Sequence, residues 1–262
     1  MSLSRLFVDH DLGPGVEAPL DEAQVHYLRH VMRRPDGASL LLFNGRDGEW
    51  RGTLEGRGKK AAVARIAERT REQAVEPDIW LCFAPLKRAR IDYVAEKSTE
   101  LGVAVLQPVV THHTIVERVN VERLRANAVE AAEQTERLSV PEVRAPMELG
   151  RLLGDWPTGR RLLVCDETGS GPPIAQALAG LDDAARSAPW AIVIGPEGGF
   201  DAAELSSLSR IKDVMAVGLG PRILRADTAA LAALACWQAL VGDWQRPTPR
   251  LHADYCTSRG IV

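Results

Sequence analysis

Two stretches late in the chain, WAIVIGPEGGF (residues 190–200) and MAVGLGPRILRADTAAL (residues 215–231), share one pattern: an apolar run, a glycine-rich turn and the start of a helix. Short apolar runs bounded by turn residues are typical of strands that are buried on both faces of a parallel sheet. Ligands bind in open α/β sheets at the carboxyl ends of the strands. Both turns are therefore candidate ligand sites, although a tight turn without a ligand would produce the same spacing.

The first turn contains Gly195, Gly198 and Gly199, which permit backbone conformations that other residues avoid. Asp201 and Glu204 form a D-x-x-E capping pattern, so a helix should begin directly after this turn. The turn has neither the G-x-G-x-x-G spacing of dinucleotide-binding folds nor the Lys-Ser/Thr pair of a phosphate-binding loop.

The second turn contains Gly218 and Gly220, and either Asp227 or Thr228 is well placed to cap the helix that follows. Two glycine-rich turns at the ends of successive strands indicate one shared pocket built from backbone amides and carbonyls. Such a pocket suits a cofactor that carries adenosine.

The rest of the chain beyond about residue 78 alternates strands with helices. Apolar runs at 161–167, 190–195 and 215–220 predict strands, and helical patterns span 88–101 and 120–136. This alternation predicts an α/β domain with a parallel sheet that helices cover on both faces. The last helix, 228–244, is apolar nearly all round, so we expect it to be buried in the core or against a partner subunit.

The first 72 residues are rich in strand patterns instead, such as RLFV, SLLLF and EWRGTL. Asp21 and Gln24 form a capping pattern for one helix, and Val25, Leu28, Val31 and Met32 fall on one face of that helix. Small β-rich domains of this size are often barrels. We place the boundary in the charged stretch at 70–77 and predict two domains, 1–72 and 73–262.

Composition narrows the class of protein further. The 262 residues carry a net charge of −3, and 45% of them are hydrophobic. The four cysteines form no C-x-x-C pair, and this spacing argues against a zinc ribbon, an iron–sulfur site and a disulfide scaffold. His112 and His113 are adjacent and would point apart in a strand, so we expect no metal site. No membrane-spanning run or signal peptide stands out, and we expect a cytoplasmic protein.

Several segments together resemble the bacterial 16S ribosomal RNA uracil-N3 methyltransferases of the trefoil-knot SPOUT superfamily. The pair IGPEGGF and LGPRILRADTA is similar to the signature of that family. LKRARIDYVAEKSTELGV and VEAAEQTERLSVPEV resemble two further family segments, and RLFV, HYLRHVMR and LLFNGRDGEW resemble its PUA-like RNA-binding domain. Asp227 departs from the family pattern, which has Glu there. Its shorter reach favours capping or positioning over a direct catalytic role.

The resemblance implies an α/β fold with a C-terminal SPOUT knot domain after an N-terminal PUA-like β-barrel. It also implies S-adenosyl-L-methionine as the cofactor, 16S rRNA of the small ribosomal subunit as the partner, and a homodimer with each site near the subunit interface. The residues expected to hold the cofactor are Gly195, Gly198, Gly199, Leu219, Gly220, Leu224, Ala226 and Thr228. The residues expected to contact RNA are Arg5, Arg29, Arg33, Lys87 and Arg88, although solvated basic faces explain such clusters equally well.

The implied reaction requires uracil N3 to lose its proton, and the resulting anion spreads onto O2 and O4. A guanidinium near these oxygens would stabilise the anion, and we expect Arg222 or Arg225 to provide it because neither has an obvious structural role in so apolar a segment. Asp227 and Glu197 are candidates for accepting or orienting the proton, while Glu197 could instead only stiffen its turn.

Two other functions compete with this interpretation. A dinucleotide-dependent oxidoreductase should carry its glycine motif in the first βαβ unit, but here both glycine turns come late. A non-catalytic RNA-binding module would explain the β-rich first domain and the basic clusters, but not two glycine turns on parallel strands.

Overall fold

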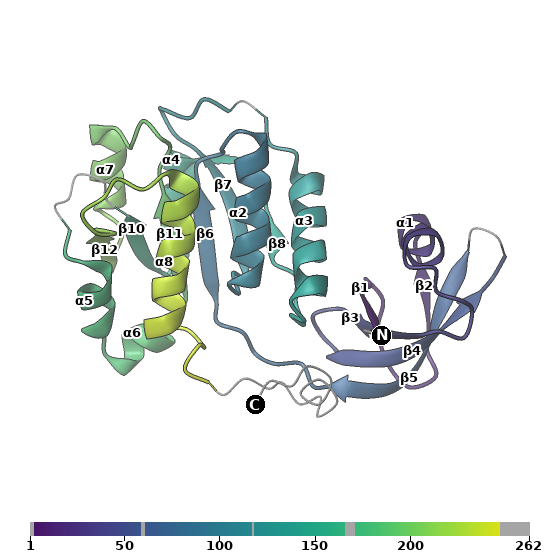
Figure 1. Cartoon of the computed structure of the whole chain (residues 1–262). Coiled ribbons are helices and arrows are strands. Elements are labelled where there is room, and N and C mark those ends of the chain that lie inside the picture. The colour runs from purple at the N-terminus through teal and green to yellow at the C-terminus, as the bar shows by residue number, and fades with distance from the viewer. Residues whose placement is uncertain (1–2, 59–60, 117, 166–170, 247–262) are drawn as a thin grey trace.

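The computed structural model describes residues 3–58, 61–116, 118–165 and 171–246, except for the side chain of Arg88. These residues form two sheets, each with its own hydrophobic core (Figure 1). The N-terminal sheet has the order β1-β3-β4-β5-β2. Its strands are β1 (Ser4–Phe7), β2 (Glu17–Leu20), β3 (Ser39–Phe43), β4 (Glu49–Gly56) and β5 (Ala62–Arg71). β1 and β3 are parallel and the other neighbours are antiparallel.

One helical segment packs on this sheet: α1 (Glu22–His26) continues into the π-helix η1 (Tyr27–Val31). The predicted capping box of Asp21 and Gln24 is present. The predicted apolar face is correct for Val25 and Leu28, which are buried, but wrong for Val31 and Met32, which are 59% and 38% exposed. The wider π turn, with its i→i+5 bonds, rotates these two later side chains away from the core.

The C-terminal sheet has the order β12-β10-β11-β6-β7-β8, with β9 also paired to β7, and all its pairs are parallel. Its strands are β6 (Ile79–Phe83), β7 (Val105–Val110), β8 (Glu142–Val143), β9 (Met147–Glu148), β10 (Arg161–Cys165), β11 (Trp190–Ile194) and β12 (Val214–Val217). Its helices are α2 (Arg88–Glu100), α3 (Val121–Gln134), α4 (Leu149–Gly154), α5 (Ile174–Ala179), α6 (Asp183–Ser187), α7 (Ala202–Leu208) and α8 (Ala226–Leu240).

Helices cover both faces of this sheet, as predicted. Ile79, Leu81 and Phe83 of β6 pack in one core with α2, α3, α5 and α8, whereas Trp80 and Cys82 pack in a second core with α4 and α7. Successive residues of a strand point to opposite faces, so one fully buried strand supplies both cores. Helix α8 lies in the first core through Ala230, Ala233, Leu234 and Trp237, which places this apolar helix mainly inside the subunit.

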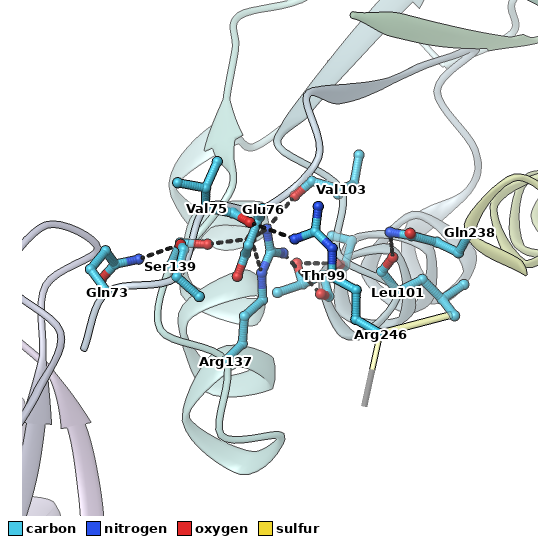
Figure 2. A network of polar contacts seen from close by, with 12 residues as sticks. Gln73, Val75, Glu76, Thr99, Leu101, Val103, Arg137, Ser139, Gln238 and Arg246 are labelled. Carbon is cyan, nitrogen blue, oxygen red and sulfur yellow. Dashed lines mark hydrogen bonds and ion pairs between the residues drawn. The ribbon is translucent and has the colours of Figure 1, made fainter. Parts of the chain in front are cut away.

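The segment between the two sheets is held against the C-terminal sheet and helices by a polar network (Figure 2). The Glu76 carboxylate accepts from Arg137 Nε at 2.9 Å and from Ser139 Oγ at 2.6 Å. The same Arg137 side chain donates to the main-chain oxygens of Thr99 and Val103, at 2.9 and 2.8 Å. Because one buried guanidinium joins the linker to both ends of the α2–β7 turn, the linker follows a fixed path.

A second contact joins β1 to the end of α3. Arg5 Nη1 donates to the main-chain oxygen of Ala132 at 2.7 Å, and Arg5 Nη2 donates to that of Arg137 at 2.6 Å. The Phe7 amide donates to Glu133 Oε1 at 2.9 Å. Apolar side chains fill the same seam, with Phe43, Ala132 and Leu138 buried together and Phe7 and Val140 packed against them. The N-terminal sheet is thus docked on the C-terminal domain by both polar and apolar contacts.

Candidate active site

The two glycine-rich turns leave the same edge of the C-terminal sheet. Strand β10 pairs with β11 on one side and with β12 on the other, in the registers Val164–Val193 and Cys165–Val217. One strand therefore separates the first cofactor loop, residues 195–200, from the second cofactor loop, residues 218–225. Two strand spacings amount to about 10 Å, which is a span that one nucleoside-sized ligand can bridge.

The first cofactor loop is a closed turn that needs its glycines. The Gly199 amide donates to the Pro196 oxygen at 3.0 Å, and Gly199 has a φ of 71°. A Cβ on Gly195 would lie 3.0 Å from the Phe200 ring. The predicted capping box at the start of α7 is confirmed, because the Glu204 amide donates to Asp201 and the Asp201 amide donates to Glu204.

The second cofactor loop differs from its prediction at the start of α8. The helix begins at Ala226, so the N-cap position belongs to Arg225, whose side chain makes no capping bond. The prediction that Asp227 or Thr228 caps this helix is therefore wrong. Asp227 lies in the first turn instead, and its Oδ1 accepts from the Thr228 amide at 2.9 Å. The extended backbone of Arg225 starts the helix earlier than the Asp-Thr pair suggested.

The main chain of the second cofactor loop offers hydrogen-bonding groups to a ligand. Among the described residues, no partner bonds the amides of Leu219, Gly220 or Leu224. Gly220 has a φ of 101°, and the space where a Cβ would stand is open. The Gly218 amide is used internally, since it donates to the Pro172 oxygen at 2.9 Å. Unpaired amides beside half-buried apolar side chains fit the adenine and ribose of an adenosine-bearing cofactor, whose recognition needs donors, acceptors and a flat apolar wall.

A cation from a third element connects the two loops. Arg90 of α2 places Nη1 at 3.4 Å from Glu197 Oε1 and Nε at 3.8 Å from Asp227 Oδ2. No role was predicted for Arg90 from the sequence. Its position could have indicated a role, because it lies in the first turn of a helix that begins at the carboxyl edge of the sheet. The two candidate carboxylates, Glu197 and Asp227, had also been given no counter-ion.

The loop after β7 also touches the first cofactor loop, which the sequence did not indicate. His113 Nδ1 lies 3.0 Å from the Gly199 oxygen, and a Cβ on Gly198 would lie 3.0 Å from the His113 Cβ. The main-chain amide of His112 donates to Glu204 Oε1 at 2.8 Å. These contacts support the first cofactor loop from the side opposite the second.

The remaining candidate residues fall into two groups: the apolar residues expected to bind the cofactor are half-buried, and the arginines expected to act in catalysis are exposed. Leu219, Leu224 and Ala226 are half-buried and pack against the first core. Arg222 and Arg225 are exposed, and no described side chain pairs with either guanidinium. The structure thus brings the glycines, the carboxylates and both arginines to one edge of the sheet.

The candidate RNA contacts are scattered, and one needs correction. Arg5 is 9% exposed and its guanidinium is bonded to Glu49 and to two main-chain oxygens, so the prediction that it contacts RNA is wrong. Arg29 donates to the Gly58 oxygen at 2.8 Å and lies 3.4 Å from Asp36. Arg33 is exposed with a φ of 52°, and Lys87 is exposed at the start of α2. The side chain of Arg88 lies outside the described part of the structure.

The described residues contain neither a metal site nor a membrane-spanning helix. Within these ranges, no three His, Cys, Asp or Glu side chains gather closely enough to hold a metal ion. No helix of the described chain combines the length and the apolar character that a membrane crossing requires.

Comparisons with known proteins agree with this geometry. Residues 73–238 match the family model of an RNA methyltransferase domain, and residues 20–67 match that of an RNA methyltransferase PUA domain. A relative from Synechocystis sp., ribosomal RNA small subunit methyltransferase E, is 33% identical over 85% of this chain and 73% of its own length. A relative of the same name from Rickettsia conorii is 28% identical over 90% of this chain and 95% of its own length.

Solved structures are similar over almost the whole chain. A methyltransferase from Legionella pneumophila, in complex with the cofactor SAM, has a TM-score of 0.81 at 29% identity and covers 93% of this chain and 100% of its own. Ribosomal RNA small subunit methyltransferase E from Neisseria gonorrhoeae, bound to S-adenosyl methionine, has a TM-score of 0.81 at 28% identity with the same coverage.

Fold and site together define the class, which is an RNA methyltransferase whose methyltransferase domain follows an RNA methyltransferase PUA domain. More narrowly, the chain belongs to the RNA methyltransferase family whose model spans its C-terminal domain. These findings confirm the family and the fold class that the motifs predicted.

Proposed function

We propose that this chain methylates N3 of a specific uridine in 16S rRNA of the small ribosomal subunit, with S-adenosyl-L-methionine as the methyl donor. The observation that carries the proposal is the meeting of two glycine-rich loops at one sheet edge, where the second loop has main-chain amides and two exposed arginines that pair with no described residue. Full-length similarity to structures bound to S-adenosyl methionine supports it.

The cofactor would lie between the two loops. Gly195, Gly198 and Gly199 would form one wall, and the second wall would be formed by Leu219, Gly220, Leu224, Ala226 and Thr228. When bound, S-adenosyl-L-methionine supplies an electrophilic methyl group on a sulfonium. The chain must hold that methyl group in the reactive orientation and exclude other orientations. Positioning of this kind can lower the activation barrier by on the order of 7–11 kcal/mol.

The side chains at the site handle the proton and the charge of the uridine. Arg222 and Arg225 are free to approach O2 and O4 of the base, where they would stabilise the negative charge that follows loss of the N3 proton. Asp227 and Glu197 supply carboxylate oxygens that can accept or orient this proton. Asp227 is the better placed of the two, because its side chain is 17% exposed whereas that of Glu197 is 51% exposed.

The RNA would extend from this edge to the N-terminal domain, with Lys87 and Arg88 near the site, Arg29 in η1 and Arg33 just after it. The contacts that dock the two sheets on each other support binding of one RNA by both domains. We infer a division into domains 1–72 and 73–262, since each contains its own core. The substrate would place the enzyme in the cytoplasm, where ribosomal subunits are assembled.

We also infer that the chain acts as a homodimer with each site near the interface. Ile223 in the second cofactor loop is 94% exposed and Ile115 in the loop after β7 is 76% exposed, so apolar side chains stand at the same sheet edge as the site. A mass of twice 28.5 kDa by light scattering would support this assembly, and a monomer at micromolar concentration would contradict it.

The decisive experiment is incubation of small ribosomal subunits, and separately of naked 16S rRNA, with enzyme and S-adenosyl-L-methionine. Mass spectrometry of RNA fragments should locate one N3-methyluridine. Absence of methylation in both substrates, with RNA binding retained, would favour a non-catalytic RNA-binding module. Thermal stabilisation by NAD but not by S-adenosylhomocysteine would favour an oxidoreductase.

A further inference from the structure

We propose that Arg90 is a positioning residue that couples the two cofactor loops, because its single guanidinium holds Glu197 of the first loop and Asp227 beside the second. The inference rests on the proposed function, since it concerns the geometry of that cofactor site. It assigns a task to a residue that lies within the family-like segment LKRARIDYVAEKSTELGV but for which the sequence predicted no role.

The three partners stand on supports of unequal rigidity. Arg90 lies in the first turn of α2, and its helix is anchored in the core by the neighbouring Ile91 and by Val94, which are 8% and 1% exposed. Glu197 lies in a turn with its side chain half-exposed, and Asp227 lies in the first turn of α8. The rigid helix therefore fixes the loops, and the guanidinium sets how far apart they stand.

Charge makes this arrangement specific. Among the described residues, Arg90 is the one cation that pairs with Glu197 or with Asp227. Without it, the carboxylates of Glu197 in the first cofactor loop and of Asp227 in the first turn of α8 would face one site with no cation of the described residues between them, and like charges disfavour close approach. Among the described residues, Arg222 and Arg225 pair with neither carboxylate, so their guanidiniums are left for an anionic ligand.

Neither contact is strong on its own. Both distances exceed those of a direct charge-assisted hydrogen bond, which is about 2.8 Å, and exposed ion pairs contribute little individually. The two ion pairs are coupled because they share the Arg90 guanidinium. When one carboxylate is lost, the guanidinium can turn fully toward the other. Groups that share a partner show non-additive effects on substitution, and this property separates coupling from simple local stability.

The first experiment measures binding of S-adenosylhomocysteine by calorimetry, so it does not depend on turnover. Arg90→Met keeps the aliphatic stem and removes the charge, and we expect a Kd roughly threefold to tenfold weaker than that of the wild type. Arg90→Lys should fall between the two, because an ammonium is a point charge that cannot fork toward two carboxylates. Arg123→Met is the matched control: its guanidinium pairs with Asp92 at 2.6 Å, in a partly exposed ion pair that joins α3 to α2, and its loss should leave the Kd unchanged.

The second experiment is a double-mutant cycle. Glu197→Gln and Asp227→Asn should be non-additive in the Kd by at least about twofold when Arg90 is present, and additive when Arg90→Met is the background. Thermal unfolding of each variant verifies that the fold is retained. Equal Kd values for Arg90→Met and Arg123→Met, or coupling that persists without Arg90, would overturn the inference while the function stands. A wild-type protein that binds no S-adenosylhomocysteine would overturn the function and the inference together.

Discussion

Arg5 Nε donates to Glu49 Oε2 at 2.7 Å in a place where the two side chains are only 6% and 2% exposed. Burial lowers the pKa of Arg5, and the neighbouring Glu49 opposes that shift. The remaining nitrogens of the guanidinium reach the end of α3 in the other domain. An internal ion pair of the first sheet is therefore also the polar part of the domain seam, so the fold of one domain and its docking on the other depend on the same side chain.

Replacement of Arg5 should consequently cost more than replacement of an ordinary arginine. Arg5→Met leaves the Glu49 carboxylate buried without its main partner, and breaking a buried pair from one side typically costs about 3–5 kcal/mol. We expect a loss of about 3 kcal/mol in the free energy of unfolding in urea, because Thr70 Oγ1 still donates to Glu49 at 2.9 Å.

Arg46 provides the matched control for this experiment. It pairs with Asp9 and Asp11 at the surface, where its side chain is 51% exposed. Arg46→Met should cost less than about 1 kcal/mol. Equal losses of unfolding free energy in the two variants would show that the buried ion pair stabilises the fold no more than a surface ion pair. A reduced salt dependence of RNA binding in Arg5→Met would restore the RNA contact that its burial argues against.

The same seam should make stability depend on pH. Burial raises the pKa of Glu133 from 4.5 to about 7, although the Phe7 amide that donates to its carboxylate acts in the opposite direction. The folded chain therefore holds this proton over a range where the unfolded chain has lost it. The contribution to stability is complete below about pH 4.5 and is lost as the pH rises through about 7.

Glu133→Gln should remove that dependence, because the amide oxygen can accept from Phe7 without carrying a charge. We expect the variant to exceed the wild type at pH 8 by up to about 3 kcal/mol in urea unfolding, and to lose the advantage near pH 4.5. Glu122→Gln, an exposed position at the other end of α3, is the control and should follow the wild-type profile. Parallel profiles for Glu133→Gln and the wild type would contradict the buried-carboxylate explanation.

The sequence predicted the features that depend on local pattern. The strands at 161–165 and 190–194, the capping box of Asp201 and Glu204, and the glycine turns at the carboxyl ends of strands all follow from residues within one short window. The resemblance to a family added the expectation of a knot in the C-terminal domain, which no periodicity reveals.

Features that depend on tertiary contacts were missed. Arg90 pairs with a carboxylate 107 residues away, so only the folded sheet brings them together. Arg5 reads as an ordinary polar residue in a strand, yet it is buried because the end of α3 in the second domain covers its side of β1. Leu6 points to the other side of the strand, into the core of the first domain. The π turn at Tyr27–Val31 changed which side chains face the core, and the early start of α8 changed which residue occupies the N-cap position. A shift of one or two residues in a helix is enough to make such predictions wrong.

RNA binding should depend on exposed arginines that have no internal partner. Arg33 is exposed, and no described side chain pairs with it, so its loss should remove a phosphate contact and reduce the slope of log affinity against log salt by about 0.7 for single-stranded RNA. Arg51→Ala is the control, because Arg51 is exposed but pairs with Glu68 at 2.6 Å. A filter-binding series over salt concentration measures both slopes, and identical slopes would remove Arg33 from the interface.

The two arginines of the second cofactor loop should determine turnover more than affinity. If a guanidinium stabilises the uracil anion, its contribution appears as charge develops, so Arg222→Ala or Arg225→Ala should lower kcat at saturating cofactor by about tenfold to a hundredfold. Binding of S-adenosylhomocysteine should stay close to that of the wild type, because neither side chain is needed for the main-chain cradle. Arg210→Ala serves as the control, since Arg210 is an exposed arginine after α7 whose guanidinium bonds Ser207 and no other described side chain. Near-normal kcat in both loop variants would refute anion stabilisation by these arginines, and the charge would then have to be met by main-chain amides alone.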